Sequence, residues 1–267
     1  MKHILLPTDF SETSFKAAVF ALDLFGTKDV RYTLVHTYLK PAFSHVLLPR
    51  VADTSAMAKN GLRRAERRIR KHAGKVRLAQ VASTEALYTV LNELAVRKAA
   101  DLVVMGTQGE GNYGLVGRNT VAAVTECVLP VIAVPAEHER ERVERIMLTN
   151  DGGAMDERTL EPLRQIALAS GAHIEVVQVW EGEPPERLAP GSKSVSELLH
   201  DIPHSLEVVS GGDVVGAINE QARASRIQLV AVVRRHKSFL DRIFQGSTSK
   251  HMALHTTEPL LVLRSRP

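Results

Sequence analysis

The most constraining feature of this sequence is an internal repeat, because the pattern of its first half returns in its second half. Residues 4–9, an apolar run that ends in Pro-Thr-Asp, match residues 146–151, an apolar run that ends in Thr-Asn-Asp. An amphipathic helical pattern follows each run and ends at a glycine, Gly26 or Gly171. A repeat of this length fixes the architecture, so we treat the chain as two copies of one unit.

Each copy is predicted to contain five strands that alternate with helices. The near-continuous apolar runs at residues 101–106 and 228–233 are typical of strands that are buried on both faces. Strands that alternate with helical patterns predict a parallel sheet with helices on both faces. We therefore expect an α/β protein of two tandem doubly wound domains, residues 1–138 and 143–267, joined by a charged segment.

The composition excludes several other classes of protein. With 44% hydrophobic residues and a net charge of +4, the chain lies outside the disordered regime. A single cysteine excludes a disulfide scaffold and a cysteine-ligated metal cluster, and no histidine pair has a third ligand, so no metal site is expected. Apolar runs are too short for a membrane span or a signal sequence. We expect a soluble cytoplasmic protein with no membrane partner.

The basic residues are concentrated in one predicted helix. An apolar face formed by Leu62, Ala65 and Ile69 leaves the remaining surface of that helix to cations. No aromatic residues interleave with these cations, and aromatic residues make up only 4% of the chain. This pattern favours a solvated helix face over a nucleic-acid or acidic-partner surface, so no nucleic-acid partner is expected. The cations are Arg63, Arg64, Arg67, Arg68, Arg70 and Lys71.

Ligands of an open parallel sheet bind beyond the carboxyl ends of the strands, where the strand order reverses. The first half has two candidate loops of this kind, residues 7–9 after the first predicted strand and residues 106–120 after the fourth. The second loop carries five glycines within residues 106–117. Glycines allow close backbone approach, and the helix that follows offers N–H groups suited to a phosphate. The G-x-G-x-x-G match at residues 109–114 is not a dinucleotide fingerprint, because it follows the fourth strand, and no Walker motif is present.

These residues resemble the universal stress protein family in its tandem two-domain form. Nucleotide-binding members carry G-x-x-G, nine residues and G-[ST] after the fourth strand, and an Asp at the end of the first. The resemblance covers nearly the whole chain and implies the strand order 3-2-1-4-5 in each domain. It implies ATP or AMP as the ligand, with or without Mg²⁺, with Asp9 on the ribose and Pro7, Thr8 and Thr37 beside the adenine. The phosphates would be held by Met105, Gly106, Gly109, Gly117, Arg118, Asn119 and Thr120.

The sequence departs from this family pattern in both halves. Seven residues separate Gly109 from Gly117 instead of nine, and Arg118 stands where Ser or Thr is usual. In the second half, residues 234–237 read Arg-Arg-His-Lys in place of G-x-x-G, although Gly-Ser-Thr follows at residues 246–248 and Asp151 keeps the acid of the first strand. We therefore expect a nucleotide site with a shortened loop in the first half and a degenerate second half.

The expected function is an adenine-nucleotide-binding sensor or regulator of the stress response, with an unknown regulatory partner. Any ATP hydrolysis should be slow, because the sequence shows no general base, Walker lysine or paired carboxylates. The alternative is a scaffold, or a protein that binds a partner or an apolar ligand, with both sites vestigial; fold alone leaves a true nucleotide hydrolase or transferase open. The resemblance also implies that the strands at residues 131–134 and 260–263 pair within the chain and form a pseudo-dimer, because the fifth strands of single-domain relatives pair across a dimer; association into a homodimer stays open.

Overall fold

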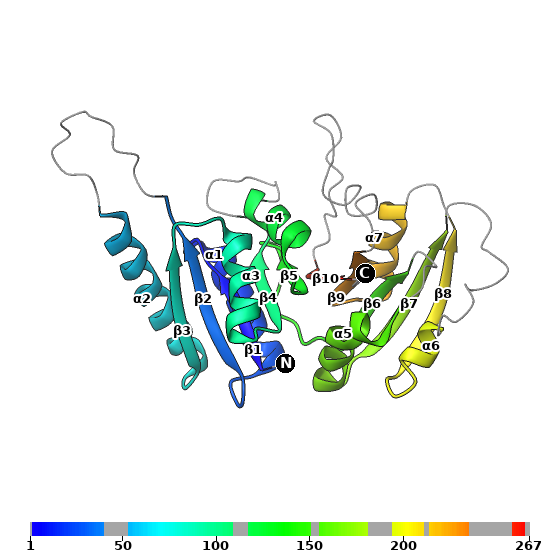
Figure 1. Cartoon of the computed structure of the whole chain (residues 1–267). Helices are drawn as coiled ribbons and strands as arrows, with labels where there is room; N and C mark the ends of the chain where they lie inside the picture. Colours follow the sequence, from blue (N-terminus) through cyan, green and yellow to red (C-terminus); the bar gives the residue numbers. More distant parts are fainter. Residues whose placement is uncertain are drawn as a thin grey trace.

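A computed structural model of the chain describes residues 2–39, 53–108, 117–150, 155–180, 194–210, 214–234 and 258–264. Strands and helices alternate in both halves, as the repeat predicts (Figure 1). The first half contains β1 (His3–Pro7), α1 (Glu12–Phe25), β2 (Arg31–Thr37), α2 (Thr54–Ala73), β3 (Arg77–Ser83), α3 (Leu87–Lys98), β4 (Leu102–Gly106), α4 (Arg118–Glu126) and β5 (Val131–Val134). The second half contains β6 (Arg145–Asn150), α5 (Glu157–Ser170), β7 (His173–Trp180), α6 (Val195–Leu198), β8 (His204–Ser210), α7 (Val214–Ala224), β9 (Leu229–Arg234) and β10 (Leu260–Arg264). The helix expected between β9 and β10 lies outside the described residues.

The first helix of each half begins and ends through the same local devices. The Ser11 side chain accepts a hydrogen bond from the Ser14 N–H at the start of α1, and the Asp156 side chain accepts one from Thr159 N–H at the start of α5. Such caps satisfy N–H groups that have no partner within the helix. Both helices end at the expected glycines, each with a φ of 70°. A side chain is strained in that left-handed region, which explains the glycine at both stops.

The strands form one ten-stranded sheet in the order β3-β2-β1-β4-β5-β10-β9-β6-β7-β8. From its outer edge inward, each half therefore has the strand order 3-2-1-4-5, which confirms the expectation. Neighbouring strands are parallel except at the centre, where β5 and β10 pair antiparallel with Leu261 opposite Ile132. The pairing of the fifth strands within the chain, which was expected, joins the two five-stranded sheets into one. This pairing buries two edges that would otherwise expose free backbone groups.

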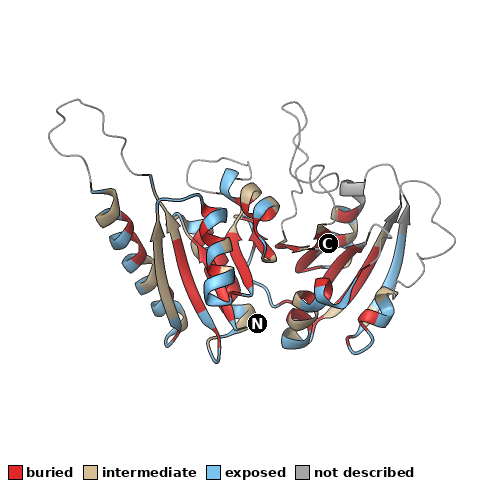
Figure 2. Ribbon diagram, viewed as in Figure 1, coloured by how far each residue is buried: buried red, intermediate tan, exposed pale blue. Residues whose placement is uncertain are grey.

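Alternation along the strands sends side chains into two apolar layers, one on each face of the sheet. Ile4 and Leu6 belong to the layer under α1, α2 and α5, whereas Leu5 belongs to the layer under α3, α4 and α7. Each layer contains buried residues of both halves, so the core continues across the central strand pair (Figure 2).

Coverage of the sheet differs between its two outer ends. Helix α2 has 20 residues and packs against β2 and β3, whereas α6 has four residues. Strand β8 is accordingly exposed over most of its length, and the side chains of Leu206 and Val208 are more than half exposed (Figure 2).

Candidate functional site

A cavity of about 720 Å³ lies at the carboxyl ends of β1, β2 and β4 in the first half. Strand β1 lies between β2 and β4, so this is the point at which the strand order reverses. Gly109 lies outside the described residues, but the other predicted site residues meet at this cavity. They are Pro7, Thr8, Asp9, Thr37, Met105, Gly106, Gly117, Arg118, Asn119 and Thr120.

The turn between β1 and α1 is held by its own side chains. The Thr8 hydroxyl accepts a hydrogen bond from the Phe10 N–H (3.0 Å) and is bonded to the Ser14 hydroxyl (3.0 Å). The Asp9 carboxylate accepts hydrogen bonds from the backbone N–H (3.1 Å) and the hydroxyl (2.6 Å) of Ser11. These bonds fix the orientation of Asp9, whose exposed carboxylate retains further acceptor capacity toward a ligand hydroxyl.

Gly106 permits a close approach between α1 and the end of β4. A Cβ atom at this position would lie 2.7 Å from Thr13 Cγ2 and 3.1 Å from the Thr13 carbonyl carbon. Any side chain here would therefore push the first turn of α1 away from the sheet. Gly106 has a packing role that the sequence did not reveal, in addition to its place on the cavity wall.

The start of α4 forms the side of the cavity where phosphates are expected. The Gly117 N–H donates to the Thr107 carbonyl (2.7 Å), and the buried Thr120 hydroxyl donates to the carbonyls of Gly106 (3.0 Å) and Thr107 (3.3 Å). Thr120 therefore fixes the start of α4 to the end of β4, and its hydroxyl proton is donated to these carbonyls. Arg118 and Asn119 are exposed in the first turn, where helix N–H groups lack intrahelical partners and favour an anion.

Sequence reasoning missed several residues of the cavity wall. His36 is the most informative, because its Nδ1 lies 2.8 Å from the Thr8 carbonyl oxygen and its ring lies 4.2 Å from that of Phe10. Its place directly before Thr37 at the end of β2 was a signal that could have found it. Leu87, which begins α3, had no such signal, because only the folded chain brings it to this edge. The missed residues are Ser14, Val35, His36, Leu87 and Gln108.

The chemistry available in this cavity is that of binding. Asp9 supplies an acceptor for hydroxyl groups, and Arg118 supplies a guanidinium that can form charge-assisted hydrogen bonds with phosphate. The walls contributed by Pro7, Leu87 and Met105 are apolar. Within the described ranges no three His, Cys, Asp or Glu side chains gather as metal ligands.

The corresponding edge of the second half is built differently. Arg234, at the end of β9, donates a hydrogen bond across the molecule to the Val124 carbonyl of α4 (2.6 Å). Burial lowers the pKa of this guanidinium, and the nearby Arg264 lowers it further. The other second-half residues considered from sequence, Asp151 and residues 235–257, lie outside the described residues.

Comparisons with known proteins identify the family. The model of the universal stress protein family matches residues 1–135 and again residues 142–264. The chain belongs to the universal stress protein family. No curated protein matches it. Among the helices of the described ranges, none combines the length and apolar character that crossing a membrane needs.

Solved structures show that this universal stress protein shares its two-domain fold with distant proteins. A universal stress protein from Archaeoglobus fulgidus is 17% identical, with a TM-score of 0.68 and 98% of each chain covered. A functionally unknown protein from Pseudomonas aeruginosa is 16% identical, with a TM-score of 0.59 and coverage of 99% of this chain and 92% of that one. The cytoplasmic domain of a prokaryotic cation chloride cotransporter is 10% identical, with a TM-score of 0.57 and coverage of 98% and 95%. Likeness at this identity shows the fold alone.

Proposed function

We propose that the first half of this universal stress protein binds an adenine nucleotide, ATP or AMP, and acts as a cytoplasmic sensor in the stress response. The observation that carries the proposal is the meeting of the predicted residues around one cavity at the reversal of strand order. Its volume, about 720 Å³, lies in the range typical of small-molecule sites.

The proposed roles follow from the side chains that each element brings to the cavity. Asp9 accepts hydrogen bonds from the ribose hydroxyls, and Thr8 and Thr37 lie beside the adenine. Arg118 and the N–H groups of the first turn of α4 hold the phosphates, with or without Mg²⁺. Because no pair of carboxylates lines the cavity among the described residues, hydrolysis of ATP should run below about 1 s⁻¹, the lower end of typical turnover numbers.

The test uses two aspartates of the first half that differ in position but not in chemistry. We would titrate ATP, ADP and AMP, with and without Mg²⁺, into nucleotide-free protein by calorimetry. Asp9→Asn removes the charge and keeps an oxygen that can accept from Ser11, and it should weaken binding roughly 10- to 100-fold, the worth of one or two hydrogen bonds to a charged group. Asp29 is exposed at a φ of 60°, which Asn tolerates, so Asp29→Asn should leave binding unchanged.

Two outcomes would overturn the proposal. If the unchanged protein produced no heat with any of the nucleotides up to millimolar concentration, the shortened loop would have closed the site and a scaffold role would take its place. If both aspartate variants weakened binding equally, Asp9 would not contact the nucleotide.

A further inference from the structure

Helix α2 carries a dense row of cations on its exposed side. It has 20 residues, with Glu66 as its single acidic residue. Two of its cations are neutralised, because Arg68 pairs with Glu12 and Arg70 pairs with Glu66. Five exposed cations of α2 have no ion pair with any carboxylate in the part of the chain that the structure describes. These are Lys59, Arg63, Arg64, Arg67 and Lys71.

Three aromatic rings lie next to this helix and come from other segments. Phe10 belongs to the turn after β1, and His36 and Tyr38 lie at the end of β2. The ring centroids of Phe10 and His36 are 4.2 Å apart, and those of His36 and Tyr38 are 6.5 Å apart with an interplanar angle of 10°. We call these three residues the aromatic row.

Two unfavourable local features accompany the position of Phe10: its own backbone conformation and the glycine inside α2 against which its ring lies. Its φ is 70°, in the left-handed region that a bulky side chain seldom occupies, and its side chain is more than a third exposed. Its ring lies against Gly61 in the middle of α2, where a Cβ atom would approach the ring to 2.4 Å. Glycine inside a helix is itself unfavourable. Strain of this kind that persists at an exposed aromatic residue points to a function of its ring.

The aromatic row and the cations share one hollow of about 570 Å³. Phe10, His36 and Tyr38 line it together with Arg63, Arg64 and Arg67. Stacking surfaces next to guanidinium groups are the combination that binds single-stranded nucleic acids, because every base has an aromatic face and every linkage has a phosphate.

We propose that α2 and the aromatic row form a binding site for single-stranded nucleic acid, with bases on the rings and phosphates along the helix. A polymer fits better than a single nucleotide, because the cations continue beyond the hollow to Lys71 along a helix about 30 Å long. The sequence favoured a solvated face because no aromatic residues interleave within α2. The folded chain supplies them from two other segments. The proposal stands independently of nucleotide binding in the neighbouring cavity, because His36 is the single described residue that the two walls share.

The electrostatic part is tested by the salt dependence of binding. We would measure fluorescence anisotropy of labelled 12-nucleotide oligo(U) and oligo(dT) with the full chain between about 50 and 200 mM salt. Removing Arg63 and Arg67 together as Arg63→Gln/Arg67→Gln should weaken binding and lower the slope of log K against log salt by about 1.4, or roughly 0.7 for each lost phosphate contact. The control variant Lys28→Gln/Arg223→Gln removes the same charge from exposed positions outside α2 and should bind as the parent does.

The stacking part is tested by removing one ring at a time. Phe10→Gly removes the ring at a backbone position that glycine prefers, and Tyr38→Leu removes the outer ring without a change in backbone preference. Each change should weaken binding by about 5- to 100-fold, the worth of one stacked base, and leave the salt slope unchanged. Melting temperatures of both variants show whether they remain folded, and Tyr38→Leu keeps the test decisive if Phe10→Gly does not.

Several results would overturn the proposal. One is the absence of binding by the parent protein at 50 mM salt and about 100 µM protein, where even non-specific sites are detected. Another is equal binding of a 12-base-pair duplex, since paired bases cannot stack on the rings. A third is displacement of the oligonucleotide by AMP together with weaker AMP binding in Arg63→Gln/Arg67→Gln, which would make the hollow part of a mononucleotide site. Asp9→Asn should change nucleotide binding alone, so the two proposals fail separately.

Discussion

The two halves of this protein are built alike at the amino ends of their central strands. In the first half a carboxylate oxygen of Asp101 accepts the backbone N–H groups of Lys2 and His3, at 2.7 and 2.9 Å. In the second half the side-chain oxygen of Gln228 accepts the two N–H groups at the start of β6, at 3.1 and 2.8 Å. Asp101 and Gln228 each precede the fourth strand of their half. A different residue type therefore provides the same pair of bonds.

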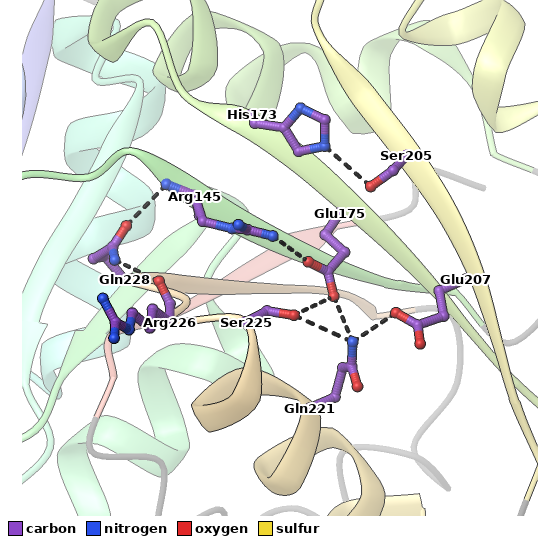
Figure 3. A network of polar contacts seen from close by, with 9 residues as sticks. All are labelled: Arg145, His173, Glu175, Ser205, Glu207, Gln221, Ser225, Arg226 and Gln228. Atoms are coloured by element: carbon purple, nitrogen blue, oxygen red, sulfur yellow. Dashed lines mark hydrogen bonds and ion pairs between the residues drawn. The ribbon is translucent and has the colours of Figure 1, made fainter.

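The neighbouring side-chain pair repeats in the same positions. His3 is hydrogen-bonded to Thr33 at 2.8 Å, and in the equivalent places Arg145 is hydrogen-bonded to Glu175 at 3.0 Å. Glu175 is buried and also accepts from Gln221 of α7 and from the Ser225 hydroxyl (Figure 3). The geometry of the repeat persists here although the chemistry has changed.

The opposite ends of the strands have diverged. The first half has the site cavity, the long helix α2 and the aromatic row, whereas in the second half Arg234 reaches across to α4 and β8 is largely exposed. The difference teaches that the amino ends hold the sheet together, and so their bonds are retained. Side chains beyond the carboxyl ends do not belong to the core, so they can differ between the halves without loss of the fold. In the first half they line the cavity, and in the second half Arg234 makes a contact with the first half.

The largest expected effect concerns the strand pair that joins the halves. Ile132 and Leu261 face each other at this joint and are fully buried. Leu261→Ala should lower the free energy of unfolding by about 2–5 kcal/mol, because it leaves a cavity in a continuous core. Val96→Ala, at a side chain that is 83% exposed, should change it by no more than about 0.5 kcal/mol.

The measurement is urea unfolding followed by circular dichroism and by the fluorescence of the single tryptophan, which is in the second half. Both probes should report one transition with the same midpoint. Separate transitions would mean that the halves unfold independently and that the joint is only a contact between two domains.

The next effect comes from exchanging one residue between the halves. Gly106 occupies the strand position that Val233 occupies in the second half. Gly106→Val should destabilise the protein by about 1–3 kcal/mol through overpacking against Thr13, and should weaken nucleotide binding as the first turn of α1 moves. Adding Thr13→Ala, which removes the nearest atom, should recover part of the loss in a double-mutant cycle. Unchanged stability of the single variant would contradict the close packing of α1 on β4.

The halves should also respond to acid in different pH ranges. Burial lowers the pKa of His3 from 6.5, an effect that the hydrogen bond to the Lys98 carbonyl only partly offsets. For Glu175, burial would raise the pKa, but hydrogen bonds from Gln221, Ser225 and Arg145 outweigh it and hold the pKa below 4.5. In both cases the unfolded chain binds more protons than the folded protein as the pH falls, so acidification lowers the free energy of unfolding. His3 does so as the pH falls from about 6.5, and Glu175 only below about 4.5.

Matched variants separate these two contributions. His3→Gln should flatten the dependence of unfolding free energy on pH between about 7 and 5, and Glu175→Gln should flatten it below about 4.5. Urea titrations at closely spaced pH values measure both slopes. If Glu175→Gln also flattened the dependence between about pH 7 and 5, the surroundings of His3 and Glu175 would be coupled through the sheet.

Much of the fold could be predicted because it depends on patterns that are local in the sequence. Apolar runs and the stops at Gly26 and Gly171 revealed the strands and helices, and the family resemblance implied the intrachain pairing of the fifth strands. The contacts of Phe10, His36 and Thr120 could not be predicted. Each depends on a partner from a distant segment: Gly61, the turn at Thr8, or the carbonyls that end β4. Sequence thus predicted the edge of the sheet at which the cavity lies more reliably than the contacts of each side chain there.

The smallest expected effect concerns the two arginines with which the second half contacts α4. Arg234 donates to the Val124 carbonyl, and Arg264 donates to the Cys127 carbonyl at 3.0 Å. Carbonyls at a helix end lack intrahelical partners and favour a cation. Arg234→Gln and Arg264→Gln should each cost about 0.5–1.5 kcal/mol, whereas Lys28→Gln, at an exposed lysine, should cost almost nothing.

The double change distinguishes a pair of separate bonds from a coupled clamp. Because the charge of Arg264 contributes to the lowered pKa of Arg234, the two guanidinium groups repel each other across the helix end. Each single change loses a bond but also relieves this repulsion, which can be relieved only once. The double variant should therefore lose more stability than the sum of the two single losses, and the excess should shrink at high salt, which screens the repulsion. Additive losses at low salt would mean that the arginines act independently, and that the second half holds α4 by two unrelated contacts.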